Sequence, residues 1–350
     1  MAVMSIRRVG TRSRSRSRSR IAGSALTAGA TAVGLLALTA CGSDDGGGGG
    51  DGAGGGRLDV VASFYPMEFL AERIGGDHVE VSTLTGPGVE PHDLELSPRQ
   101  TARVTEADLV VYLAGLQPTV DEAVETSGVA HVAEATSFTS LEEHGDDVHG
   151  EEEHADEHGD EHAEEGHEGH DHDHEGGDPH IWLDPAKYAE VAEGVGDALA
   201  EADPDHAADY ARNTDTLVEE LHALDGEFTE GLAGRQSDTF ITTHAAFGYL
   251  AEAYGLHEEA IAGLDPESEP SAARMRDLQD IAEADGVSTI FFETLVSDDT
   301  ARTLADDLGL TTAVLDPVEG ITDESAGSDY LAVMRANLAA LQAALGVPAS

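Results

Sequence analysis

The chain has 350 residues, of which 70 are acidic and 18 are basic, so its formal net charge at pH 7 is −52. Such a charge repels nucleic acid and anionic lipid headgroups and attracts cations, which argues against DNA, RNA or phosphate ligands. Acidity alone is weak evidence for metal binding, because many proteins are simply acidic. The length is sufficient for two domains of ordinary size.

The first 56 residues have the pattern of an export and attachment segment. We interpret residues 1–40 as a lipoprotein signal peptide, because an arginine-rich head is followed by an uncharged apolar stretch. That stretch ends in LTAC, which resembles the bacterial lipobox and predicts lipidation at Cys41. A transmembrane anchor is the alternative, but the position of the only cysteine favours lipidation. The glycine-rich residues 41–56 are expected to form a flexible tether on the outer face of the cell membrane.

Residues 57–203 alternate between strand-like and helix-like segments and predict an N-terminal α/β lobe. Short apolar runs with β-branched residues indicate buried strands, and the helices begin near proline or serine. The expected strands are 58–64, 79–84, 108–113 and 129–133. The expected helices are 66–73, 97–106, 118–125 and 185–201.

Residues 142–178 interrupt this alternation with histidine, acid and glycine. They contain almost no apolar side chain to bury, so we expect a disordered loop. Imidazoles among carboxylates form weak sites for borderline cations, and this loop is predicted to bind metal secondarily; a solvated spacer is the alternative. Its nine histidines are His144, His149, His154, His158, His162, His167, His170, His172 and His174.

Residues 204–234 are predicted to form one linking helix, and residues 235–350 a C-terminal α/β lobe. The helix has an apolar stripe at Leu217, Leu221, Leu224 and Phe228. The strands expected after it are 239–243, 256–262, 289–292 and 312–315. Such alternation implies parallel sheets covered by helices. The predicted fold class is therefore α/β: two lobes, each with a mainly parallel sheet flanked by helices, joined by one long rigid helix.

Four candidate metal ligands lie at or after predicted strand ends or in a distinctive motif. They are His92 in GPGVEPHD, His180 in DPHIWLDP, His244 in THAAFGY and Asp316 in VLDP. Ligands of α/β proteins bind outside the carboxyl ends of strands, and three imidazoles with a carboxylate or water suit tetrahedral Zn²⁺. Taken singly, each histidine is also explained as a hydrogen-bonded structural group, and Asp316 as a turn cap.

The motifs around these residues resemble those of the cluster A-I solute-binding proteins of ABC transporters, the zinc and manganese group. The resemblance spans residues 58–346 and includes GVEPHD, DPHIWLDP, THAAFGYL, and FFET before VLDP. It implies two α/β lobes bridged by one rigid helix, with a metal held between them. The ligand positions that it implies are His92, His180, His244 and Asp316.

Three carboxylates remain open in their roles. Water or Glu293 is the alternative to Asp316 as the fourth ligand. If it is not a ligand, Glu293 is expected to accept a hydrogen bond from the second ring nitrogen of a metal-bound imidazole, and Glu90 is a further candidate for this role.

Position 244 indicates which metal is bound. Manganese-type members usually have glutamate there, whereas imidazole suits zinc. The resemblance thus implies a high-affinity zinc-binding component of an importer, which delivers Zn²⁺ to an ABC permease and its ATPase. The alternatives are a manganese-type import protein, and a surface metallochaperone or adhesin not tied to import.

No enzyme motif accompanies these residues. The sequence has no HExxH on a predicted helix, no GxSxG and no glycine-rich phosphate loop followed by lysine. We therefore expect no enzyme. We expect a monomer that does not bind nucleic acid and that is attached to the membrane through the lipid on Cys41.

Overall fold

The computed structural model describes residues 56–144 and 177–348. The expected signal peptide, the lipidation site Cys41 and nearly all of the tether lie outside the described residues. So do eight of the nine histidines of the 142–178 segment, all except His144. Within the two described ranges, no helix is both long and apolar enough to cross a membrane.

The first lobe is built on a four-stranded parallel sheet with the order β2-β1-β3-β4. Its strands are β1 (Leu58–Ala62), β2 (Val79–Thr83), β3 (Leu109–Tyr112) and β4 (His131–Glu134). Its helices are α1 (Tyr65–Gly75), α2 (Pro98–Glu106) and α3 (Pro118–Ser127). Helix α2 begins where expected, because Ser97 and Gln100 form a capping box at its start.

The second lobe repeats this topology, with a parallel sheet in the order β6-β5-β7-β8. Its strands are β5 (Thr239–Thr242), β6 (His257–Ala260), β7 (Thr289–Phe292) and β8 (Thr311–Val314). Its helices are α6 (Gly248–Tyr254), α7 (Ala272–Asp285), α8 (Asp299–Leu308) and α9 (Tyr330–Ala344).

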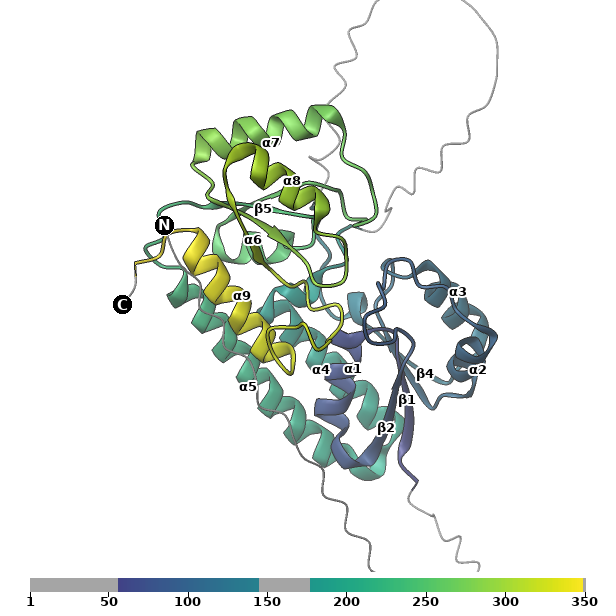
Figure 1. Ribbon diagram of the computed structural model, residues 1–350. Coiled ribbons are helices and arrows are strands. Elements are labelled where there is room, and N and C mark those ends of the chain that lie inside the picture. Colours follow the sequence, from purple (N-terminus) through teal and green to yellow (C-terminus); the bar gives the residue numbers. More distant parts are fainter. Residues whose placement is uncertain (1–55, 145–176, 349–350) are drawn as a thin grey trace, which may run out of the picture. The chain divides into compact units, whose positions relative to one another are not determined.

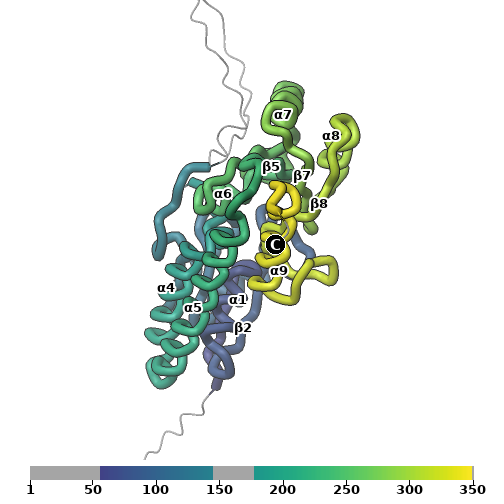
Figure 2. Tube along the Cα trace, turned by 90° about the vertical axis from the view of Figure 1, so that its left-hand side faces the viewer, coloured from purple at the N-terminus to yellow at the C-terminus, as the bar shows by residue number. Residues whose placement is uncertain are grey.

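Two helices lie between the sheets in the sequence, α4 (Pro185–Ala202) and α5 (Ala207–Gly231). They pack side by side (Figures 1 and 2). Helix α5 contacts α1 and α4 of the first lobe and α9 of the second, and its buried face carries the predicted apolar stripe. The predicted fold class, two parallel-sheet α/β lobes joined by a long helix, is confirmed.

One hydrophobic core runs through both lobes, while each sheet has a smaller cluster on its other face. The smaller clusters join β1 and β3 to α2 and α3, and β5 and β7 to α7 and α8. Within the shared core, Trp182 Nε1 donates to the Pro317 carbonyl over 2.6 Å, and the Tyr330 hydroxyl donates to the Trp182 carbonyl over 2.6 Å. These buried bonds tie the two lobes together beside the site described next.

Candidate metal centre

Three imidazoles and one carboxylate converge between the lobes: His92, His180, His244 and Glu319. One ligand atom of each lies within 4.8 Å of all the others, and in the described ranges no other group of histidine, cysteine, aspartate or glutamate does so. Glu319 Oε1 is 3.3 Å from His92 Nε2, 3.5 Å from His180 Nε2 and 3.8 Å from His244 Nε2. Bonds of about 2.0–2.1 Å to a tetrahedral Zn²⁺ separate its ligand atoms by about 3.3 Å. The spacing therefore fits one such cation.

Each lobe contributes two of these side chains. His92 lies on the loop between β2 and α2, and His180 immediately precedes the single 3₁₀ turn Ile181–Leu183. His244 follows β5, and Glu319 follows β8. The strands of each sheet are parallel, so their carboxyl ends, and the loops after them, share one edge.

A carboxylate supports each of the two fully buried imidazoles. His180 Nδ1 lies 2.7 Å from Asp178 Oδ1, and His244 Nδ1 lies 2.7 Å from Glu293 Oε1. An ionised carboxylate only accepts hydrogen bonds, so each Nδ1 carries the proton. Once these imidazoles are neutral, both Nε2 atoms are left with a lone pair directed at the cluster, which is the tautomer that a metal ligand requires.

The charges around the cluster also suit a cation. Burial by itself raises the pKa of the Glu319 carboxyl, but hydrogen bonds from His180 and His92 outweigh it and hold that pKa well below its usual range. Burial lowers the pKa of imidazoles, yet the Asp178 carboxylate raises that of His180 to about 10, and Glu293 raises that of His244. A divalent cation would replace the protons that these imidazoles hold.

Three buried carboxylate oxygens near the site lack a hydrogen-bond partner within the described part of the chain. They are the Oε2 atoms of Glu90, Glu293 and Glu319. An unpartnered buried carboxylate oxygen is costly, and a cation offsets that cost. Glu90 Oε1 accepts the His92 N–H over 3.2 Å, and burial together with the Glu319 charge raises the pKa of Glu90 to about 8.

The structure does not bring Asp316 into this cluster, although the sequence predicted it as a ligand. Its Oδ1 accepts the Val318 N–H over 2.8 Å, and its Oδ2 accepts the Thr294 hydroxyl over 3.3 Å. Asn337 binds both its backbone N–H and its carbonyl, over 2.9 Å and 2.7 Å. Asp316 therefore organises a turn, and the carboxylate that lies in the cluster is that of Glu319.

That turn explains why the sequence did not predict Glu319 as a member of the cluster. Val318 has a φ of 60°, which β-branched residues rarely adopt, and the surrounding bonds hold it there. No residue type in DPVEG predicts the turn at Val318, so the sequence points instead to Asp316, which follows the strand. A second carboxylate three residues later was the only available signal.

His144 is the one histidine of the 142–178 segment that the structure describes, and both of its ring nitrogens are engaged. Its Nδ1 lies 3.0 Å from Asp178 Oδ2, and its Nε2 lies 3.0 Å from Glu252 Oε2. The two ends of the segment are thus part of the folded unit, because the buried Asp178 carboxylate requires partners. This differs from the expectation that the whole segment is disordered, and it gives His144, predicted as one of the weak secondary metal ligands, two carboxylate partners within the fold.

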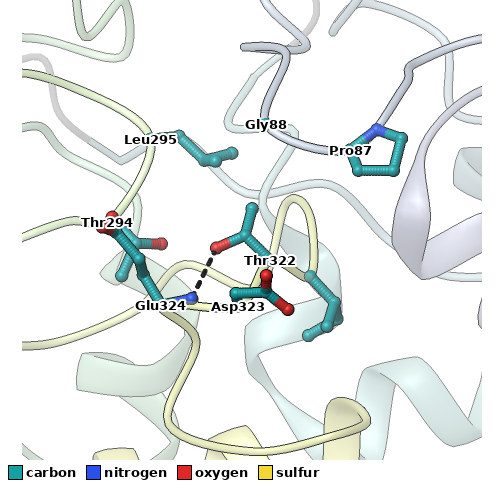
Figure 3. A pocket seen from close by; sticks show the side chains of 8 residues that line it. Pro87, Gly88, Thr294, Leu295, Thr322, Asp323 and Glu324 are labelled. Atoms are coloured by element: carbon teal, nitrogen blue, oxygen red, sulfur yellow. Dashed lines mark hydrogen bonds between the residues drawn. The ribbon is translucent and has the colours of Figure 1, made fainter. Parts of the chain in front are cut away.

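A pocket of about 680 Å³ lies between loops of both lobes (Figure 3). Its lining segments adjoin the cluster in sequence: Pro87 and Gly88 precede His92, while Thr294 follows Glu293. The third segment comes from residues 321–324, just after Glu319. It carries two exposed acidic residues, Asp323 and Glu324, whose charge attracts cations to this pocket.

The comparison with known families decides the classification. The family described as zinc-uptake complex component A, periplasmic, matches residues 60–344. The chain belongs to this family. The resemblance to metal-binding solute-binding proteins drawn from the motifs is confirmed.

Two curated members of this zinc-uptake group illustrate the similarity. The zinc-binding lipoprotein AdcA of Streptococcus pneumoniae serotype 4 is 36% identical over 292 residues, which cover 82% of this chain and 56% of AdcA. This chain thus spans little more than half of that relative. The high-affinity zinc uptake system protein ZnuA of Bacillus subtilis strain 168 is 36% identical over 292 residues, covering 83% of this chain and 88% of ZnuA.

Solved structures show the same similarity. Zn(II)-bound AdcA from Streptococcus pneumoniae matches with a TM-score of 0.68 and 32% identity, covering 84% of this chain and 59% of AdcA. The laminin-binding protein Lmb of Streptococcus agalactiae, a bifunctional protein with adhesin and metal transporting activity, matches with a TM-score of 0.69. It is 29% identical and covers 82% of this chain and 99% of Lmb.

Proposed function

We propose that this chain is the extracytoplasmic zinc-binding component of an ABC-type importer, and that His92, His180, His244 and Glu319 bind one Zn²⁺ between the lobes. The spacing of three Nε2 atoms and one carboxylate oxygen carries the proposal. Membership of the zinc-uptake family and the zinc-binding relatives support it.

Zinc is proposed over manganese because three of the four donors are imidazole nitrogens. Mn²⁺ prefers carboxylate, carbonyl and water oxygens, whereas imidazole suits zinc. Asp178 and Glu293 strengthen this preference, since they fix the tautomers of His180 and His244 and raise their basicity as ligands.

The geometry supports binding rather than catalysis. A catalytic zinc site has three protein ligands and leaves the fourth position to water or substrate, whereas four protein donors meet here. The ion is then cargo that is released to a partner. We propose that this partner is an ABC permease with its ATPase, that the lipid on Cys41 keeps the monomeric protein at the membrane, and that His149 to His174 bind additional zinc weakly.

The test is the stoichiometry and affinity of zinc binding, measured by competition with a chelator. A variant lacking residues 149–174 keeps His144 and Asp178 and is expected to retain one tight site, because all four proposed ligands remain. The full chain is expected to bind additional zinc weakly. A shortened variant with no tight site, or one that prefers Mn²⁺, would contradict the proposal.

Adhesion is a second candidate, because Lmb combines adhesin and metal transporting activity. Binding of the purified protein to immobilised laminin tests it. Import as the sole function predicts no laminin binding, together with a growth defect of a deletion strain that zinc supplementation relieves.

A further inference from the structure

Asp178 is shared between two imidazoles. Its Oδ1 accepts hydrogen bonds from the backbone N–H of His180 (2.9 Å) and from the ring Nδ1 (2.7 Å). Its Oδ2 faces His144 Nδ1 at 3.0 Å. The Asp178 side chain is fully buried, so each oxygen depends on these protein partners.

His144 also reaches the second lobe. Its Nε2 lies 3.0 Å from Glu252 Oε2 on α6, and its ring meets the Tyr249 ring edge-on, with centroids 4.6 Å apart. The Tyr249 hydroxyl donates to the Asp178 carbonyl over 2.8 Å. Backbone and side chain of Asp178 are therefore both held from this side.

The first residue of α6 leaves room for this contact. A Cβ built on Gly248 would lie 2.5 Å from His144 Cβ, which is closer than real Cβ contacts come. Only glycine at position 248 lets the imidazole lie against the start of the helix. The position of His144 is thus set by the shapes of its neighbours as well as by two carboxylates.

We propose that His144 is a positioning residue for the zinc site: it holds Asp178, which holds His180, and it links this edge of the site to α6 of the other lobe. The inference rests on the proposed function. It gives the first histidine of the histidine-rich segment a different role from the others, because its nitrogens are occupied by carboxylates. Without His144, the Asp178 side chain is freer to rotate, and His180 is held less well.

The expected effect is faster release of zinc. Outer partners of metal ligands contribute about 10- to 100-fold to metal affinity. His144 acts one step further out, through Asp178, so His144→Ala should speed zinc dissociation by the lower end of this range, about tenfold. The amide nitrogen of asparagine lies near the place of Nδ1, and that of glutamine near Nε2. His144→Asn should therefore restore slow release, whereas His144→Gln should not. Gly248→Ala should act like His144→Ala, because the added methyl displaces the ring.

The measurement is zinc dissociation from the full chain into excess chelator, together with the visible spectrum of the Co²⁺-loaded protein, which reports ligand geometry. Two controls separate other causes. His222→Ala removes an exposed histidine on α5, and Gly226→Ala adds a methyl to α5 where no atom lies within 4 Å. Both should match the unmodified protein.

Each outcome has one meaning. Equal effects of His144→Ala and His222→Ala would overturn the positioning role, since the loss of any histidine would then have the same effect. Slow release in His144→Gln but fast release in His144→Asn would also overturn it, by assigning the effect to Glu252 alone. If the unmodified protein binds zinc but His144→Ala releases it normally, only this inference fails. If the unmodified protein lacks a tight zinc site, the proposed function fails with it.

Discussion

The three imidazoles of the site are held in two different ways. The side chains of His180 and His244 are fully buried, one from each lobe, and each has a carboxylate 2.7 Å from Nδ1. The His92 side chain is 8% exposed and lies on a loop, and burial lowers its pKa by more than the Glu319 carboxylate raises it. The comparison indicates a fixed pair of ligands in the shared core and a third that is more easily replaced.

The largest effects should come from removing the ligands themselves. The binding free energy of zinc at a site with four protein ligands is about 10–16 kcal/mol. Losing His180 or His244 should therefore weaken zinc binding at least about a hundredfold. His180→Ala and His244→Ala should do so, while His92→Ala should cost clearly less, because water reaches that position. Chelator competition measures all three. An equal loss for His92→Ala would remove the distinction between the fixed pair and the third ligand.

Weakening the support of one fixed ligand should have the next largest effect. Glu293→Gln removes the charge behind His244 and should lower zinc affinity about 10- to 100-fold. The matched control is Glu95→Gln. Glu95 is exposed and lies three residues after His92 on the loop between β2 and α2, and its substitution should leave zinc affinity unchanged. Unchanged zinc affinity in Glu293→Gln would mean that burial alone orients the His244 ring.

The pH dependence follows from the same difference. Unperturbed imidazoles would confine the loss of zinc affinity to pH values below about 6.5. Because the pKa of His180 is raised to about 10 and that of His244 is also raised, zinc must displace protons at neutral pH. Affinity should therefore keep rising above pH 7, by about tenfold per pH unit for each proton displaced. A constant zinc affinity from pH 6.5 to 8.5 would contradict this proton displacement.

Metal-free stability should show the opposite trend. A histidine whose pKa is raised in the folded state stabilises the fold. This stabilisation is complete below the unfolded pKa of about 6.5 and is lost as pH rises through the folded pKa. For His180 that window runs from about 6.5 to about 10. Thermal unfolding of the metal-free protein at pH 6 and 9 measures it, and His180→Asn should flatten the change.

The smallest effect should come from the predicted ligand that the structure places elsewhere. In Asp316→Asn an amide oxygen still accepts the Val318 N–H, so only the strength of the turn changes and zinc affinity should fall less than about tenfold. Glu319→Gln, in contrast, should cost much more, because it replaces the charged donor. If Asp316→Asn is the more damaging variant, the fourth ligand has been misassigned.

Much of this protein was evident from its residues in order. Strand and helix periodicity predicted both lobes and the long helix, because a buried face imposes its spacing on local sequence. The motifs around His92, His180 and His244 indicated the imidazoles of the proposed site. His244 directly follows β5 and His92 lies on the loop after β2, so parallel-sheet topology accounts for both positions.

The carboxylate of the proposed site and the contacts that position it were decided by tertiary structure. Glu319 reaches the cluster only because Asp316, Asn337 and Trp182 hold a turn in which Val318 adopts a φ of 60°. Such a conformation is contrary to the local preference of valine, so no sequence pattern predicts it. The contact of His144 with Asp178 and Glu252 likewise joins residues 34 and 108 positions apart. Sequence spacing defines neighbours along one element, whereas these contacts depend on how separate elements pack.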